Sequence, residues 1–108
     1  MQCYHGRRTG AGVLVTVNSV SLDPRRDLSD HSPDGFEWGY GGSGPAQLAL
    51  AILADYLGND NEALTLYQSF KWSVVAKLPQ RGLRMSSRDI DQALEGIRSQ
   101  NLVTGGAS

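Results

Sequence analysis

Cysteine, histidine and long apolar runs are scarce in this sequence, and each scarcity argues against a class of function. Cys3 is the only cysteine, so the chain can form no internal disulfide and no zinc site based on cysteine pairs. The two histidines, His5 and His31, lack the spacing of metal ligands. No apolar run approaches the roughly 18 residues that a membrane span needs, and no signal peptide is visible at the start. We therefore expect a cytoplasmic protein without membrane contact, metal or cofactor.

An excess of charge of either sign is also missing. The chain has 10 basic and 11 acidic residues and a formal net charge of −1, whereas a dedicated nucleic-acid-binding protein usually has a strongly basic face. Catalytic patterns are absent too: there is no Walker A lysine, no serine elbow and no His-Glu-x-x-His. For a single domain of 108 residues, these absences favour a protein that is not an enzyme. Nucleic acid stays a possible partner that the composition does not favour.

The first 22 residues are predicted to form a small antiparallel meander. Residues 13–17 are rich in β-branched side chains, which favour strands, and Asn18-Ser19 is a candidate two-residue turn. Pro24 cannot donate to a strand ladder and ends the meander. The three expected strands are residues 3–8, 13–17 and 20–22.

Residues 44–98 are predicted to contain three helices, of which the first has the clearest start. Proline is favoured at the first helical position. The helix should therefore begin at Pro45, with Gly44 as its cap and Gln47 reaching back toward the cap. An apolar stripe then runs to Gly58, which is a stop signal.

Two further helices follow this stop signal. Residues 61–78 repeat apolar positions on one face before Pro79, and the short link predicts a helical hairpin. Ser86 or Ser87 should cap the third helix, and residues 99–108 are expected to be a frayed tail. The predicted fold class is α+β, with a three-stranded meander packed against the hairpin and the third helix.

The connection between the meander and the helices, residues 23–43, is long for a compact domain. Aromatic rings are costly to leave in water, and three of them lie in its second half. We therefore expect an ordered loop that buries most of these rings. Glycine permits a positive φ and a close backbone approach, and we expect at least one of Gly41, Gly42 and Gly44 to adopt a positive φ.

The aromatic residues of this loop are candidate binding residues. Phe36, Trp38 and Tyr40, joined later in the chain by Trp72, form either a contact surface or a cap over a small core. Glu37 lies between two of the rings. It could act as a general base, although hydrogen bonds to loop amides or pairing with an arginine is the simpler interpretation.

Two further groups of residues are candidates for binding an anion or a partner. Gly41, Gly42, Ser43 and Gly44 form either a phosphate cradle at the start of the helix or a tight turn. Four arginines could gather on one side of the meander, or could instead pair with nearby aspartates in a salt-linked surface. These arginines are Arg7, Arg8, Arg25 and Arg26, and the aspartates are Asp23, Asp27 and Asp30.

Residues 22–24, 35–49 and 66–72 resemble an uncharacterised family of small bacterial and phage proteins that share the motif FEWGYGGSGPAQLA. The resemblance covers most of the chain, and it implies no activity because the family is a domain of unknown function. It suggests a phage or mobile-element setting, in which short proteins often bind and block a host component.

The sequence thus predicts a non-enzymatic protein-interaction module, such as an inhibitor or regulator of a host component, for example of a defence system. Its contact surface would combine the aromatic loop with the arginines. The alternative is a small phosphate, nucleotide or nucleic-acid binder that uses the glycine-rich loop at the start of the first helix.

Overall fold

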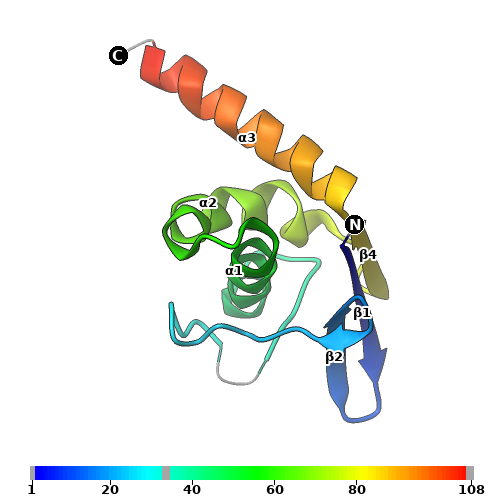
Figure 1. Ribbon diagram of the computed structural model, residues 1–108. Coiled ribbons are helices and arrows are strands. Elements are labelled where there is room, and N and C mark those ends of the chain that lie inside the picture. Colours follow the sequence, from blue (N-terminus) through cyan, green and yellow to red (C-terminus); the bar gives the residue numbers. More distant parts are fainter. Residues whose placement is uncertain (1, 33–34, 107–108) are drawn as a thin grey trace.

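A four-stranded antiparallel sheet lies against two of the three helices in the computed structural model (Figure 1). The structure describes the backbone of residues 2–32 and 35–106, and side chains up to residue 100. The third helix projects beyond the rest of the molecule. The whole molecule, with this helix, measures 49 × 26 × 25 Å. The α+β class is therefore as predicted, and the number of strands is not.

The sheet has the strand order β3-β2-β1-β4, in which the first three strands form the predicted meander. They are β1 (Cys3–Thr9), β2 (Gly12–Val17) and β3 (Val20–Ser21). Asn18 and Ser19 both have positive φ values, 49° and 71°, as the two central residues of a type I′ hairpin turn require. This turn confirms the prediction for these two residues.

The prediction of three strands was wrong because a fourth strand, β4 (Gly82–Ser86), pairs with β1. Its register places Met85 opposite Tyr4 and Leu83 opposite Gly6. The alternation of buried and exposed residues in β4 covers only five positions, and its partner strand lies at the other end of the chain. A local pattern of that length does not reveal such a long-range pairing.

The first helix, α1 (Ser43–Leu57), is the centre of the core and is buried over most of its length. It begins two residues before the predicted Pro45, and Gly42 rather than Gly44 is its N-cap. Proline is tolerated there because the N–H groups of the first turn have no partner within the helix. Gly58 ends α1 with a φ of 63°, as its role as a stop signal required.

Gln47 has a different role from the predicted return to the helix cap. Its side chain is fully buried, and its amide holds the preceding loop in place. The Oε1 atom accepts hydrogen bonds from the backbone N–H groups of His31 and Ser32, at 2.7 and 3.2 Å. The Nε2 atom donates to the carbonyls of Pro24 and Ser29, at 2.6 and 3.0 Å. The buried side chain of Gln47 thus fixes the described part of the loop. Residues 33 and 34 of the predicted ordered loop lie outside the described residues.

The second helix, α2 (Asp60–Ser73), is shorter than predicted and is followed by a 3₁₀ turn, η1 (Val75–Lys77). The side chain of Asn59 accepts a hydrogen bond from the N–H of Glu62 at 3.1 Å and caps the helix. Val74 leaves helical geometry with φ −127° and ψ −63°. β-Branched residues are the less favoured helix formers, and two of them follow each other at this end.

The third helix, α3 (Ser87–Gly106), starts with the predicted cap and extends further than predicted. The carboxylate of Asp89 accepts a hydrogen bond from the N–H of Ser86 at 2.9 Å, and the Ser86 hydroxyl accepts from the N–H of Asp89 at 3.3 Å. This reciprocal pair is a capping box. The helix continues through most of the predicted tail, and residues 107 and 108 lie outside the described residues.

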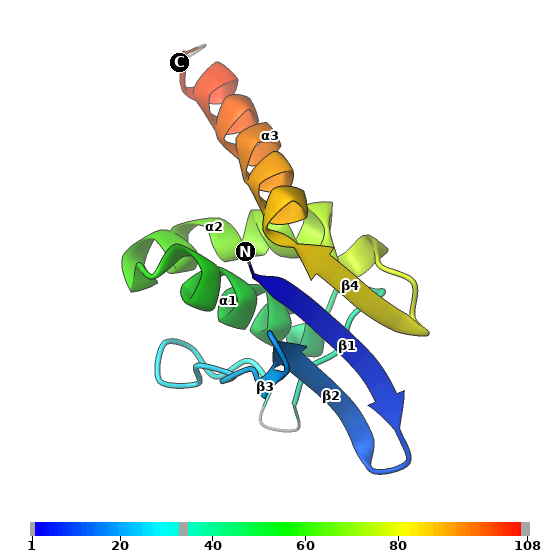
Figure 2. The ribbon, with the colours of Figure 1, turned by 45° about the vertical axis from the view of Figure 1, so that its right-hand side comes forward.

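The sheet has one face covered by helices and one face that the helices leave open (Figure 2). Tyr4, Val15, Leu83 and Met85 point toward the helices and are buried. The intervening residues of β1 and β4 are mostly exposed. This alternation follows from the period of two in a strand.

Candidate functional site

The structure divides the predicted aromatic set into a buried part and an exposed part. Trp38 has no exposed surface, and Phe36 is partly buried against the same core. Tyr40 is 46% exposed and Trp72, on α2, is 57% exposed. The expectation that most of the loop aromatics are buried is therefore right for Trp38 and wrong for Tyr40.

Trp38 is held in the core by contacts from two other segments. Its indole N–H donates to the carbonyl of Pro79 at 3.1 Å, and the guanidinium of Arg8 lies 4.7 Å from the ring centroid. Gly6 of β1 leaves room for the ring, because a Cβ at that position would lie 3.1 Å from it. Trp38 thus joins β1, the loop and the segment after η1, which is a structural role.

The exposed rings of Tyr40 and Trp72 lie against two adjacent glycines. A Cβ on Gly41 would come within 2.2 Å of the Trp72 ring, and a Cβ on Gly42 within 2.8 Å of the Tyr40 ring. The ammonium of Lys71 lies 4.2 Å from the centroid of the Trp72 ring. We call these five residues, Tyr40, Gly41, Gly42, Lys71 and Trp72, the aromatic patch.

The glycines of this segment are required for close approach rather than for a positive φ. Gly41, Gly42 and Gly44 all lie outside the positive-φ region, so the expectation that one of them occupies it was wrong. The loop glycines that do so are Gly35 and Gly39, with φ values of 118° and 88°. A sequence shows where glycines cluster but not which of them turns the chain, because that depends on where the loop must go.

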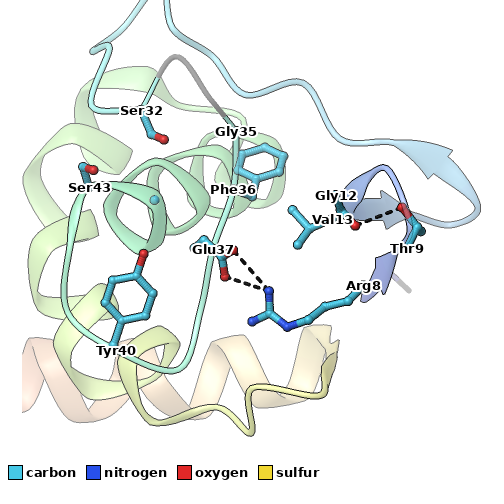
Figure 3. A pocket seen from close by; sticks show the side chains of 11 residues that line it. Arg8, Thr9, Gly12, Val13, Ser32, Gly35, Phe36, Glu37, Tyr40 and Ser43 are labelled. Atoms are coloured by element: carbon cyan, nitrogen blue, oxygen red, sulfur yellow. Dashed lines mark hydrogen bonds and ion pairs between the residues drawn. The ribbon is translucent and has the colours of Figure 1, made fainter.

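The start of α1 borders an open pocket of about 450 Å³ beside the loop (Figure 3). Arg8 reaches across this pocket from β1, and its Nη1 atom lies 2.9 and 3.1 Å from the two carboxylate oxygens of Glu37. Its Nε atom donates to the carbonyl of Gln80 at 2.6 Å. Glu37 therefore pairs with an arginine, as the simpler of its interpretations predicted.

The candidate phosphate cradle, residues 41–44, lies next to a carboxylate. A Cβ on Gly44 would be 2.6 Å from the Cβ of Glu37, so the two residues are in close contact. The first turn of α1 contains no acidic residue and its N-cap makes no side-chain hydrogen bond. The negative charge of Glu37 nevertheless opposes the binding of an anion at this pocket.

The four predicted arginines do not form one cluster. Arg8 is used in the pocket, while Arg25 pairs with Asp27 at 3.0 Å and with Asp60 at the start of α2 at 2.9 Å. Arg26 lies 3.9 Å from Asp30. Arg7 is exposed on the open face of the sheet, pointing away from Arg8. The salt-linked surface was thus the right interpretation for Arg25 and Arg26.

The titratable groups with shifted pKa values have structural partners. Burial and a 2.5 Å hydrogen bond to Asp55 raise the pKa of the Tyr4 hydroxyl, and a 2.5 Å hydrogen bond to Asp91 raises that of Tyr56. Two hydrogen bonds from Arg25 hold the pKa of Asp27 below its ordinary value.

Within residues 2–32 and 35–106, no group of three or more metal-ligating side chains comes together.

Trp72 was predicted only as an addition to the aromatic residues of the loop, although its position in the second helix indicates an exposed side chain. The apolar stripe of the second helix contains Ala63, Tyr67 and Phe70, and Trp72 lies off that stripe. A large ring on the polar side of a helix is a sign of an exposed contact residue. His5 and Arg84, which share the open face of the sheet with Arg7, were also outside the predicted set, and Arg84 was missed because β4 itself was not predicted.

Comparison with known proteins gives a family and no activity. No helix in the described part of the chain is both long and apolar enough to cross a membrane. The chain matches no curated protein and no solved structure. Residues 4–96 match the profile of a family of unknown function, DUF6166, and this match spans nearly all of the sheet, α1, α2 and the first half of α3. The chain therefore belongs to the DUF6166 family.

Proposed function

We propose that the protein is a non-enzymatic interaction module that binds a protein partner through the aromatic patch. The observation that supports this proposal is the exposure of Tyr40 and Trp72, whose rings lie against the adjacent Gly42 and Gly41. Tyrosine and tryptophan dominate binding energy at protein interfaces because each ring contributes a large contact area. The biological role that we propose for the module is that of an inhibitor or regulator of a host component.

The glycines give this surface a defined shape. Neither Gly41 nor Gly42 could carry a side chain without displacing a ring, so both rings rest directly on the backbone. Rings held in this way lose little conformational freedom when a partner covers them, which favours binding. The cation of Lys71 lies over one ring and adds a positive charge to the patch.

The competing phosphate-binding proposal has less support. The pocket at the start of α1 contains the Glu37 carboxylate, and the nearest arginine, Arg8, is already paired with it. A phosphate would have to separate this pair. Thermal unfolding with phosphate and nucleotides tests this alternative, because a ligand of the folded state raises the melting temperature.

The proposal is tested by affinity capture from a host-cell lysate with three forms of the immobilised protein. These forms are the wild type, the double variant Tyr40→Ala/Trp72→Ala, and the control Val20→Ala, which truncates an exposed apolar side chain on β3 instead. We expect a partner that the wild type and the control retain and the double variant loses. For the purified pair, the double variant should weaken binding by about 2 kcal/mol or more. Equal retention by all three forms would contradict the proposal.

A further inference from the structure

The open face of the sheet brings together side chains from all four strands. His5 lies opposite Thr16 in β2 and opposite Arg84 in β4, and Thr16 lies opposite Ser21 in β3. Residues that are paired across strands point to the same side of the sheet. We call this surface the outer face, and its described members other than glycine are Cys3, His5, Arg7, Thr9, Leu14, Thr16, Ser21, Arg84 and Ser86.

The outer face has positive charge and no strand carboxylate. None of the four strands contains an aspartate or a glutamate, whereas Arg7 and Arg84 are both exposed on this face. Two more exposed arginines flank β4: Arg81 precedes the strand, and Arg88 lies in the first turn of α3. The nearest acidic side chain along the chain, Asp89, is bound to Ser86 at one end of the strand.

The arginines of the outer face differ from the four arginines that form ion pairs. Arg8, Arg25, Arg26 and Arg98 each form an ion pair. Within the described residues, Arg7 and Arg84 form neither an ion pair nor a hydrogen bond through their side chains. The charges are therefore unevenly distributed although the net charge of the whole chain is small, and unpaired positive charge lies along β1 and β4.

We propose that the outer face binds the sugar–phosphate backbone of a nucleic acid, with Arg7 and Arg84 as its principal phosphate ligands. Arginine, serine, threonine and asparagine are the side chains that most often contact phosphate oxygens. Thr16 and Ser21 lie in the same row of the sheet as Arg84. A cavity of about 290 Å³ on this face is lined by His5, Asn18 and Arg84, among others.

A phosphate backbone fits this face better than an acidic protein segment does. Protein interfaces need apolar or aromatic anchors at their centre, and Leu14 is the one large aliphatic side chain among the described members of the face. The described members also include no phenylalanine, tyrosine or tryptophan, so bases have no ring on which to stack. The contact is therefore with the backbone and independent of sequence.

Fluorescence anisotropy with labelled DNA tests the proposal. The probes are a random-sequence single strand and its duplex, titrated with the whole protein at salt concentrations from about 50 to 200 mM. We compare the wild type with Arg7→Gln, Arg84→Gln and the double variant. The matched control is Arg98→Gln, which removes the same charge from an exposed arginine of α3 that is paired with Glu62.

We expect the wild type to bind with a dissociation constant of about 1–100 μM and with marked salt dependence. Each single variant should lower the slope of log K against log salt by about one, and the double variant should bind about tenfold more weakly. Arg98→Gln should bind as the wild type does. The relative affinities of the single strand and the duplex identify which form the face prefers.

Three results would overturn the proposal. The first is no binding by the wild type at the lowest salt concentration. The second is an equal loss in the Arg98→Gln control. The third is binding of poly-glutamate as tightly as DNA and with the same dependence on Arg7 and Arg84, which would identify an acidic protein segment as the ligand. The Tyr40→Ala/Trp72→Ala variant should keep its DNA affinity, so this proposal fails or stands independently of the aromatic patch.

Discussion

The two tryptophans of this chain occupy opposite environments, although one belongs to the glycine-rich segment and the other lies against it. Trp38 is fully buried and hydrogen-bonded to a backbone carbonyl, whereas Trp72 is more than half exposed and lies over Gly41. Buried aromatic surface stabilises a fold, and exposed aromatic surface is available to a partner. The segment that contributes Trp38 to the core therefore also supplies the glycines beneath the exposed ring.

The largest expected effect is that of Trp38→Ala. Removal of a fully buried indole leaves a cavity and should lower the free energy of unfolding by about 3–5 kcal/mol. Domains of this size have only about 5–15 kcal/mol in total, so the variant should be close to unfolded at room temperature. Urea unfolding followed by circular dichroism measures the loss. If Trp38→Ala lowered the free energy of unfolding no more than Trp72→Ala does, the contrast between a buried and an exposed tryptophan would be contradicted.

A smaller effect is expected for Gly39→Ala, with Gly41→Ala as its counterpart on the exposed side. Gly39 has a positive φ, and a Cβ there would lie 2.5 Å from Cγ of Gln80 and 3.0 Å from the carbonyl of Leu78. The strained backbone should cost about 1–3 kcal/mol. At Gly41 the obstacle is the exposed Trp72 ring, which can swing away.

The same pair of variants separates stability from binding. Gly41→Ala should melt near the wild-type temperature and still weaken the capture of a partner, because the ring is displaced. Gly10→Ala is the control, since a Cβ there meets no atom within 4 Å. Differential scanning fluorimetry ranks the three variants. If Gly41→Ala proved as destabilising as Gly39→Ala, the ring of Trp72 would have to be counted as part of the core.

The third prediction concerns Tyr4, which lies on the same core side as Trp38. Its pKa is raised by burial and by the hydrogen bond to Asp55. The unfolded chain then ionises at a lower pH than the folded one, so wild-type stability should fall as the pH rises above about 10. Tyr4→Phe should cost about 1 kcal/mol at neutral pH, and the difference from the wild type should shrink in alkaline solution. Unfolding curves at several pH values check this, and a constant difference would contradict it.

The smallest expected effect on stability is that of Trp72→Ala. Substitutions at exposed sites usually change stability by less than about 0.5 kcal/mol, and the cation of Lys71 adds only a weak contact at an exposed ring. Acrylamide quenching of tryptophan fluorescence provides a second readout. Quenching should be efficient in Trp38→Phe, which keeps Trp72, and inefficient in Trp72→Phe. The opposite result would reverse the assignment of the two rings.

Local patterns predicted much of the fold. The β-branched run and the Asn18-Ser19 turn indicated the hairpin of β2 and β3, and the capping box of Ser86 and Asp89 indicated the start of α3. These signals act over two to four residues, so they survive whatever the rest of the chain does. The start of α1 was less well predicted, because the side chain of Gln47 bonds to backbone groups of the folded preceding loop instead of reaching back to the helix cap.

The sequence by itself determined the α+β class, the first three strands, the three helices and the segment in which glycines and aromatic rings gather. Tertiary structure alone decided that β4 pairs with β1, which tryptophan is buried, and which arginines stay unpaired. Burial and charge pairing depend on segments that lie far apart in the chain, such as Arg8 with Glu37 or Arg25 with Asp60. Such pairings are settled by packing over the whole domain, and no local pattern in the chain encodes them.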